Sequence, residues 1–224
     1  VPEYVERRQF TLSPPDLKQY GVCGSPDEEW LCIGFDRLLK TRELALPGRH
    51  NIANSLAALA LGDSVGLPRH AMLDSLRSFH GLAHRCEFVA TQQGVTYIND
   101  SKGTNVGATV AAIEGLGATI DGKVILLAGG IGKGADFSDL KAPMLQFGRA
   151  AMVYGQDGDA ISHVLIDEID TYRQADMAAA LEQARRIAQP GDLILLSPAC
   201  ASFDAYQNFE QRGEHFCQLV EAQG

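Results

Sequence analysis

The spacing of apolar and polar positions divides the 224-residue chain into two regions of different texture. Residues 1 to about 47 are rich in loop-forming residues, with short strand-like runs near residues 8–12 and 30–34. Residues 49–65 then carry apolar side chains at helical spacing, and Pro68 opens a second helix that ends near Phe79. The first region therefore predicts a loop-rich start followed by two helices.

From about residue 82 onward, strand-like and helix-like patterns alternate, and Gly94 separates the first two strands as in a hairpin. The predicted strands are residues 88–91, 95–98, 123–128, 150–154 and 192–196, and the predicted helices are residues 104–116, 137–147, 174–188 and 205–222. Parallel strands need long crossover connections, which are usually helical. This alternation therefore predicts a doubly wound α/β domain with a mostly parallel sheet.

Composition and charge exclude several classes of protein. The formal net charge is −9, the pI is near 5.1 and no run of Lys or Arg occurs, so we expect no nucleic-acid partner. The apolar runs are too short to cross a bilayer, and the first ten residues do not resemble a signal peptide, so we expect no membrane insertion.

The five cysteines form no C-x-x-C pair, which predicts reduced thiols in a cytoplasmic protein. The chain begins without Met, which suggests a fragment.

Three predicted loops carry candidate chemistry. In parallel sheets, ligands bind outside the carboxyl ends of the strands, where loops lead into helices. The loops in that position are residues 99–105, 129–134 and 197–204. They offer Lys102, Lys133, hydroxyl groups and the N–H groups of helix starts, which together suit an anion such as phosphate or carboxylate.

Each of these residues also has an ordinary structural interpretation. Lys102 and Lys133 resemble the solvated lysines found on most surfaces, and Asp100 is suited to orienting the backbone of its own loop. Ser202 and Asp204 are of residue types that often cap the N-terminus of a helix, here the last helix. Both interpretations stay open from these residues alone, and no Ser/His/Asp set, H-E-x-x-H motif or metal-ligand cluster occurs.

Asn51 and Asn54 stand near the start of a predicted helix. Their i, i+3 spacing puts both amides on one helix face, where they are able to hydrogen-bond the edge of a base. Capping or plain surface exposure is the alternative.

The loop at residues 130–135 also matches the dinucleotide-binding pattern G-x-G-x-x-G/A, and Asp157 follows about twenty residues later. That pattern belongs to the first strand–helix unit of a domain, whereas here at least one such unit precedes it. Lys133 inside the loop also suits an anion better than close helix packing. No G-x-x-x-x-G-K-[ST] string occurs, so the sequence contains no P-loop.

Five motifs together resemble the Mur ligases. Residues 48–58 (GRHNIANSLAA) and 81–87 (GLAHRCE) are similar to segments shared by Mur and folylpolyglutamate ligases. Three further segments point to the branch of the family that adds D-glutamate, namely residues 98–105 (INDSKGTN), 127–136 (LAGGIGKGAD) and 196–210 (LSPACASFDAYQNFE). The motifs typical of the branches that add diaminopimelate, L-alanine or a dipeptide are absent.

The resemblance implies a domain organisation. Residues 1–81 would be the C-terminal part of a central P-loop ATPase domain, and residues 82–224 a complete, Rossmann-like, amino-acid-binding domain. The uridine-binding domain, the P-loop, the magnesium ligands and a carbamylated lysine would all lie upstream. The resemblance therefore implies ATP and Mg²⁺ as cofactors, no metal ligand on this chain, and no catalytic activity of the chain by itself.

The resemblance also implies a reaction and site residues. ATP would phosphorylate the carboxylate of UDP-N-acetylmuramoyl-L-alanine, and the amine of D-glutamate would displace the phosphate. The nucleotide-binding residues would be Asn51, Asn54, Arg85, Asp100 and Lys102, of which Arg85 and Lys102 would also be catalytic. The D-glutamate-binding residues would be Thr104, Lys133, Ser202, Phe203 and Phe209. We expect such a protein to be a cytoplasmic monomer.

Three other functions stay open at this point. A folylpolyglutamate-type ligase shares the first two motifs but should lack the segments at residues 98–105 and 196–210. A dinucleotide-dependent oxidoreductase would use residues 130–135 and would not respond to glutamate. A stand-alone binding domain would require the gene to begin near Val1.

Overall fold

A computed structural model of the chain describes residues 7–25, 28–46 and 48–222, apart from the side chain of His50. The chain forms two compact units, which follow one another in the sequence with the division between Gly81 and Leu82. Each unit has a hydrophobic core of its own. The assignment of the first unit to an ATPase domain stays a prediction.

The first unit combines a small antiparallel sheet with two helices. The sheet has the order β1 (Tyr20–Ser25), β2 (Glu28–Ile33) and β3 (Asp36–Lys40), and a short 3-10 helix, η1 (Thr41–Glu43), follows it. The two predicted helices are confirmed as α1 (Arg49–Ser64) and α2 (Arg69–Ser78). Ile52, Leu56 and Leu59 recur on one face of α1 and pack in the core with the sheet.

The predicted strand near residues 8–12 is wrong, because only an isolated bridge from Phe10 to Tyr20 forms there. Strands β1 and β3 carry no clear period-2 alternation, and we did not predict them. The strand predicted near residues 30–34 corresponds to β2.

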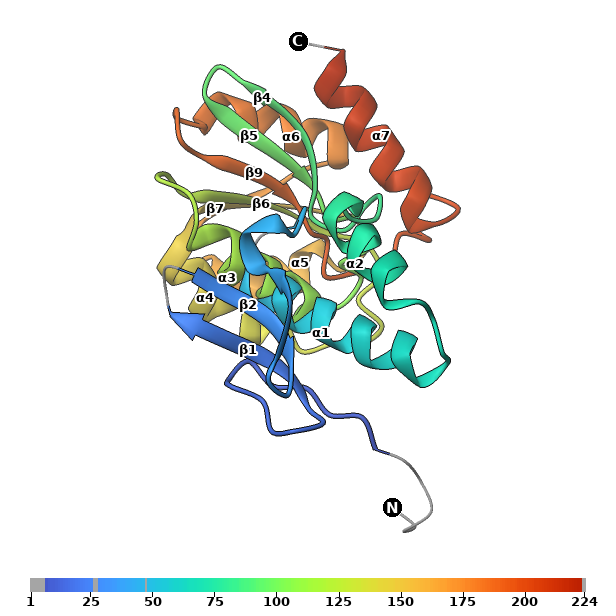
Figure 1. Cartoon of the computed structure of the whole chain (residues 1–224). Coiled ribbons are helices and arrows are strands. Elements are labelled where there is room, and N and C mark those ends of the chain that lie inside the picture. The colour runs from blue at the N-terminus through green and yellow to red at the C-terminus, as the bar shows by residue number, and fades with distance from the viewer. Residues whose placement is uncertain (1–6, 26–27, 47, 223–224) are drawn as a thin grey trace. The chain divides into compact units, whose positions relative to one another are not determined.

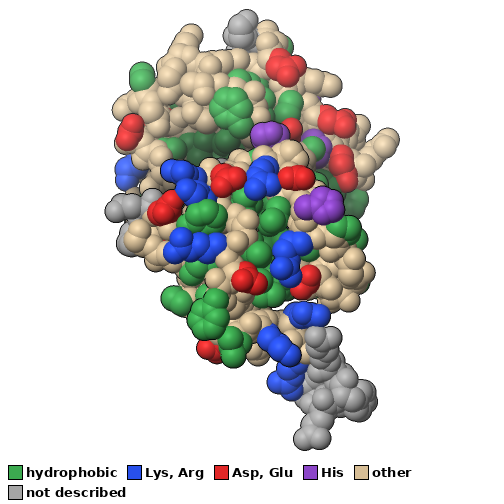
Figure 2. All heavy atoms as spheres, viewed as in Figure 1, with side chains coloured by type: hydrophobic (Ala, Val, Ile, Leu, Met, Phe, Trp, Pro, Cys, Tyr) green, Lys and Arg blue, Asp and Glu red, His purple; other side chains and the backbone are tan. Residues whose placement is uncertain are grey.

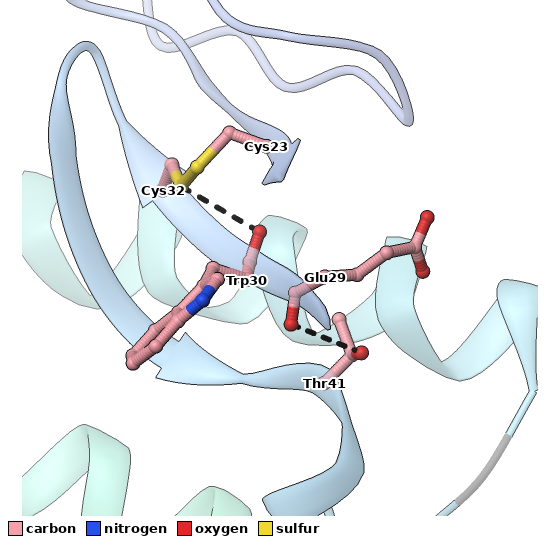
Figure 3. Close-up of a disulfide and its surroundings, with 5 residues drawn as sticks. All are labelled: Cys23, Glu29, Trp30, Cys32 and Thr41. Atoms are coloured by element: carbon pink, nitrogen blue, oxygen red, sulfur yellow. Dashed lines mark hydrogen bonds between the residues drawn. A yellow bond between two sulfur atoms is a disulfide. The ribbon is translucent and has the colours of Figure 1, made fainter. Parts of the chain in front are cut away.

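Cys23 and Cys32 form a disulfide bond between β1 and β2, which Figure 3 shows in close-up. The prediction that all cysteines are reduced is therefore wrong for this pair. In the strand register, Cys23 faces Trp30 and Cys32 faces Gly21, so the two cysteines are diagonal neighbours. Gly21 has no side chain, and the Cα separation of 6.3 Å lies within the range for disulfides. The other three cysteines are Cys86, Cys200 and Cys217, which are free.

The second unit contains a six-stranded sheet with the order β4-β5-β9-β6-β7-β8. The strands are β4 (Glu87–Gln92), β5 (Val95–Asn99), β6 (Val124–Gly129), β7 (Gly148–Tyr154), β8 (Asp170–Arg173) and β9 (Leu193–Leu196). Strands β4 and β5 pair antiparallel, in agreement with the predicted hairpin. The other neighbouring strands of this sheet are parallel. The predicted mostly parallel sheet is confirmed.

Helices cover both faces of this sheet, as Figure 1 shows. The helices are α3 (Val106–Gly117), α4 (Lys141–Phe147), α5 (Gly158–Leu165), α6 (Met177–Ile187) and α7 (Phe209–Glu221), and the 3-10 helix η2 (Ser138–Leu140) precedes α4. Helices α3, α4 and α5 pack on one face, and α6 and α7 pack on the other. Successive residues of the buried strand β6 serve opposite cores, with Leu126 in one and Leu127 in the other. The domain is therefore doubly wound, as predicted.

The structure shows neither a large single-sign charge patch on the drawn face (Figure 2) nor a membrane-spanning helix among the described residues. On the face drawn in Figure 2, Lys and Arg side chains are interspersed with Asp and Glu side chains. Within the described ranges, no helix combines the length and the apolar character that a membrane crossing requires.

Candidate functional site

Three loops lie next to one another at the carboxyl edge of the large sheet. They follow β5, β9 and β6, which are neighbours in the sheet, so the loops at residues 99–105, 197–204 and 129–134 are adjacent as well. Helix α7, which follows β9, packs on one face of the sheet, whereas α3 and α4, which follow β5 and β6, pack on the other. The loops therefore diverge on both sides of β9, and such a switch point is where open α/β sheets bind ligands.

Backbone hydrogen bonds join the three loops into one assembly. The loop after β9 lies in the middle, and its Ala199 N–H donates to the carbonyl of Gly103 in the first loop at 2.9 Å. On its other side, Ile131 and Ala201 exchange two hydrogen bonds of 2.9 Å each. Residues separated by up to a hundred positions in the sequence are thus fixed together by the main chain.

The loop after β6 presents Lys133 to solvent. Lys133 is exposed and has a φ of 54°, a region that is uncommon for residues other than glycine. Gly129 has a φ of 148°, and a Cβ there would lie 1.9 Å from the Tyr154 carbonyl oxygen, so only glycine fits. Unusual backbone conformations cluster at binding sites, where they aim a side chain.

Asp157 holds this loop in place. Its carboxylate accepts a hydrogen bond from the Gly132 N–H at 2.6 Å. In a dinucleotide-binding site the corresponding acidic residue would bind a ribose hydroxyl. Here that carboxylate serves its own loop instead, which disfavours the oxidoreductase alternative.

The loop after β9 places Ser202 and Phe203 side by side. Ser202 is buried, whereas the Phe203 side chain is 64% exposed. The Ser202 carbonyl accepts hydrogen bonds from the N–H groups of Ala205 and Tyr206, so the segment is a turn.

Ser202 and Asp204 do not cap the last helix, and that structural interpretation is wrong. Helix α7 begins at Phe209, and the Asn208 side chain caps it by accepting from the Gln211 N–H at 2.8 Å. Asp204 instead accepts from the Gln156 N–H at 3.0 Å.

The loop after β5 contains a buried carboxylate. Asp100 is 7% exposed, and its two oxygens accept hydrogen bonds from the Cys86 N–H at 3.2 Å and from the Ser197 hydroxyl at 2.7 Å. Burial raises the pKa of Asp100, and these two hydrogen bonds oppose that rise. Asp100 therefore anchors the loop between the start of the unit and the end of β9, and its contact with a ribose stays a prediction.

Lys102 and Phe209 contact each other. The Lys102 ammonium lies 3.9 Å from the centroid of the Phe209 ring, in a cation–π contact. The Lys102 N–H donates to the His84 carbonyl at 2.9 Å, and the Thr104 N–H donates to the Lys102 carbonyl at 2.8 Å. Thr104 is half-buried and stands just before Asn105, which caps α3.

Arg212 is a residue that the sequence did not single out. It is 1% exposed, and its guanidinium donates to the Ser101 hydroxyl at 3.0 Å, the Ser101 carbonyl at 2.9 Å and the Cys200 carbonyl at 3.1 Å. The Ser101 hydroxyl in turn donates to the Phe209 carbonyl at 2.7 Å. Arg212 therefore ties two loops of the site to the first turn of α7. No sequence signal revealed it, because an Arg in an amphipathic helix ordinarily faces solvent.

Arg85 lies at the start of the second unit, where its side chain is exposed. Its positive charge lies close enough to Asp100 to lower the pKa of that carboxyl, against the larger effect of burial. Among the residues that the structure describes, no group of three or more His, Cys, Asp or Glu could hold a metal ion.

The first unit contains a separate pocket beside α1. It has a volume of about 220 Å³ and is lined mainly by apolar side chains, including Leu44, Leu76 and Phe79. Asn51 and Asn54 also line it, and the Asn54 amide nitrogen lies 3.5 Å from the Asn51 amide oxygen. An apolar slot with amides along one wall is suited to a flat heteroaromatic ring.

Comparison with known proteins identifies the family. The family model for the Mur ligase glutamate ligase domain matches residues 84–200, more than half of the 224 residues. The chain belongs to the Mur ligase family. The matched segment contains the loops after β5 and β6 and the first residues, up to Cys200, of the loop after β9. The resemblance noted from the motifs is confirmed.

Close relatives of this Mur ligase chain carry one name. A protein of Nitrosococcus oceani is 55% identical over 212 residues, and one of Pseudomonas aeruginosa is 52% identical over the same length. Both are named UDP-N-acetylmuramoylalanine–D-glutamate ligase. The alignments cover 95% of this chain but only 46% and 47% of those relatives. The chain thus spans about half the length of the relatives it matches.

Solved structures support the Mur ligase fold. A pseudomurein peptide ligase type C from Methanothermus fervidus superposes with a TM-score of 0.65 at 15% identity, covering 94% of this chain and 43% of that one. At this identity the match shows the fold and no more.

Proposed function

We propose that this chain is the C-terminal part of an ATP-dependent ligase that joins D-glutamate to UDP-N-acetylmuramoyl-L-alanine in peptidoglycan precursor synthesis. The observation that carries the proposal is the assembly of three hydrogen-bonded loops at the switch point of the large sheet, with Lys133 exposed among them. The relatives at 52–55% identity, which are named for this reaction, support it. A folylpolyglutamate-type ligase is disfavoured, because these relatives match through the segments that such an enzyme should lack.

D-Glutamate has two carboxylates, so its site needs a cation and several hydrogen-bond donors. Lys133 supplies the cation, and its exposed ammonium forms no ion pair with the described residues. The hydroxyls of Thr104 and Ser202 and the backbone N–H groups of Phe203 and Phe209 supply donors. Because Phe209 is the first residue of α7, its N–H belongs to the positive end of that helix.

ATP is proposed to bind residues of both units. The adenine ring occupies the pocket beside α1, where Asn51 and Asn54 hydrogen-bond its edge. Asp100 faces the ribose, and Lys102 and Arg85 supply positive charge close to the phosphates. Fixed positive charge stabilises the negative charge that develops during phosphoryl transfer.

The proposed reaction has two steps. A carboxylate oxygen of UDP-N-acetylmuramoyl-L-alanine bonds to the γ-phosphorus of ATP, the bond to the bridging oxygen breaks, and ADP leaves. The amine of D-glutamate then attacks the acyl carbon and loses a proton, and the tetrahedral intermediate expels inorganic phosphate. Lys133 and its neighbouring donors orient the amine for this attack.

Water competes with the amine for the acyl phosphate, so we propose that the site closes during the reaction. Gly81 is the proposed hinge, because it stands at the division between the two units and has a φ of 101°.

We propose four further properties of this protein. The 224-residue chain by itself is inactive, because it contains no P-loop. The magnesium ligands that accompany ATP come from a preceding part of the protein. The protein works as a monomer. It works in the cytoplasm, where ATP is supplied.

The experiment that tests this function measures phosphate release by the full-length protein in the presence of ATP, Mg²⁺ and UDP-N-acetylmuramoyl-L-alanine. We expect release that depends on D-glutamate, with little response to L-glutamate and none from the 224-residue chain alone. Equal release with either enantiomer, or none with either, would contradict the proposal.

A further inference from the structure

Two buried hydroxyl groups stand behind Asp100, the residue proposed to face the ribose of ATP. Ser197 is the first residue after β9, and Thr109 lies in the first turn of α3. Both residues are 0% exposed, whereas Asp100 is 7% exposed. A nucleotide is therefore able to touch Asp100 but not the two hydroxyls, which act on a ligand only through the carboxylate.

The three side chains form a chain of hydrogen bonds. The Ser197 Oγ lies 2.7 Å from the Asp100 Oδ2 and 3.0 Å from the Thr109 Oγ1. A hydroxyl has one proton and an ionised carboxylate only accepts, so the proton of Ser197 points to Asp100. The Thr109 hydroxyl in turn has two acceptors on Ser197, the Oγ and the carbonyl oxygen at 3.2 Å. Thr109 therefore holds Ser197 in place, and Ser197 holds the carboxylate.

The backbone of Asp100 is fixed as well. Its N–H donates to the Leu196 carbonyl at 2.7 Å, and its carbonyl accepts from the Gly103 N–H at 2.8 Å. What the backbone does not fix is the rotation of the carboxylate, because the last torsion of an Asp side chain has broad preferences. The Cys86 N–H on Oδ1 and the Ser197 hydroxyl on Oδ2 set that rotation from opposite sides.

The carboxylate keeps acceptor capacity for a ligand hydroxyl. An ionised carboxylate has about four acceptor positions. The Cys86 N–H and the Ser197 hydroxyl occupy two of them, and the Cys86 thiol, a weak donor, occupies a third. A ribose hydroxyl is able to take the remaining position or to displace the thiol. Hydrogen bonds to an ionised acceptor are among the stronger ones.

We propose that Ser197 is a positioning residue for the nucleotide, which orients the Asp100 carboxylate toward a ribose hydroxyl of ATP. The inference rests on the proposed function, because it takes ATP as the ligand. It adds a specificity to that function, since the protein should distinguish ATP from a deoxyribonucleoside triphosphate. Without the Ser197 hydroxyl, the carboxylate is free to rotate and is no longer aimed at the ribose.

Deoxynucleotides test this role. D-Glutamate-dependent phosphate release by the full-length protein is measured with ATP, 2′-deoxy-ATP and 3′-deoxy-ATP. For the wild type, kcat/KM with at least one deoxynucleotide should be about tenfold or more below that with ATP, because a hydrogen bond to a charged group is lost. In Ser197→Ala this ratio should fall to about twofold or less, since ATP itself loses the contact. A purely structural defect would lower activity with all three nucleotides alike and leave the ratio unchanged.

Thr109→Val is the second variant, because it removes the hydroxyl behind Ser197 while the side chain stays branched. It should reduce the ratio in the same direction, to a smaller extent. Thr171→Val is the matched control. The Thr171 hydroxyl bonds the Ile169 carbonyl at 3.0 Å on the edge strand β8, so its loss should leave the ratio at the wild-type value.

An unchanged ratio in folded Ser197→Ala would overturn the proposal while leaving the contact of Asp100 with the ribose in place. If Ser197→Ala does not fold, an unchanged ratio in folded Thr109→Val would overturn it. A wild type that uses all three nucleotides equally would overturn both the Asp100 contact and this inference, although D-glutamate-dependent release would still support the ligase reaction. No D-glutamate-dependent release with ATP would contradict the proposed function, and this inference with it.

Discussion

The Lys102 ammonium lies 3.9 Å from the centroid of the Phe209 ring. Lys102 belongs to the proposed nucleotide site and Phe209 to the proposed D-glutamate site, and the two residues come from elements more than a hundred positions apart. The contact fixes the lysine over the first residue of α7. A change of the Phe209 side chain should therefore affect the proposed nucleotide site.

Phe209→Leu should raise the KM for ATP more than the KM for D-glutamate, because the backbone N–H proposed to bind D-glutamate is kept. Loss of the aromatic face frees Lys102 from a contact of about 0.5–1 kcal/mol, which corresponds to a change of about two- to fivefold in the KM for ATP. Phe209→Tyr keeps the aromatic face and is the control. Steady-state kinetics of the full-length protein measure both constants, and an unchanged KM for ATP in Phe209→Leu would show that the contact has no role in catalysis.

Arg212→Lys should lower activity although it keeps the charge. A lysine ammonium lacks the planar fork that bridges Ser101 and Cys200, so the two loops lose their common support. We expect kcat/KM for D-glutamate to fall by about tenfold or more, while the folded state persists in circular dichroism. Wild-type kinetics in a folded Arg212→Lys protein would show that activity does not depend on the hydrogen bonds from Arg212 to the two loops.

The buried carboxylate of Asp192 should make stability depend on pH. Its side chain is 0% exposed and accepts from Arg149 at 2.5 Å and from the backbone N–H groups of Lys123 and Gln189. Burial alone raises the pKa of Asp192, but these hydrogen bonds outweigh it and the pKa is lowered. Because the pKa of Asp192 is lower in the folded state, its ionisation stabilises the protein at pH values above the unfolded pKa of about 4. This contribution is lost as the pH falls from that value through the folded-state pKa.

Asp192→Asn should therefore lower the free energy of unfolding at pH 7 by about 2–3 kcal/mol, because it leaves Arg149 without a counterion. Urea unfolding at pH 7 and pH 3 measures the difference, which should shrink at the lower pH. Asp159→Asn is the control, because Asp159 forms an exposed ion pair with Arg173 that contributes little. A difference that stays constant across this pH range would contradict the assigned pKa.

Reduction of the bond between Cys23 and Cys32 should destabilise the first unit. In a chain-entropy estimate, a disulfide that closes a loop of this length contributes about 2–3 kcal/mol. Thiol titration of the denatured, unreduced chain should detect three of the five cysteines, and all five after reduction. Five reactive thiols before reduction would show that the bond does not form in the isolated protein.

Much of the fold followed from the sequence because its strongest patterns are local. Strand β6 is a continuous apolar run between helices, which is typical of a buried parallel strand. Strand β8 (Asp170–Arg173) escaped prediction because it is a short, polar edge strand, and α5 escaped because it has only eight residues. The last helix begins at Phe209 rather than Ala205, since Asn208 and not an earlier residue is its cap.

The adjacency of the three loops was predictable, but the contacts between them were not. The rule for parallel sheets correctly brought the three loops together, because it depends only on the order of strands and helices. The bridge between Ile131 and Ala201 and the buried guanidinium of Arg212 depend on contacts between distant segments, which no local pattern encodes. The pairing of Cys23 with Cys32 likewise depends on the strand register.

Lys133 provides the most direct test of the proposed D-glutamate site. The residue is exposed, so Lys133→Ala should leave the free energy of unfolding within about 0.5 kcal/mol of the wild type. Loss of its charge-assisted hydrogen bond to a carboxylate should raise the KM for D-glutamate by about ten- to a hundredfold. The KM for ATP should change little.

The decisive measurement is therefore the KM for D-glutamate of full-length Lys133→Ala, followed by phosphate release, beside Lys141→Ala as a control. Lys141 is an exposed lysine that pairs with Glu168 and lies outside the three loops. A large rise confined to Lys133→Ala is the result that the proposed site predicts. An unchanged KM for D-glutamate in Lys133→Ala would contradict it.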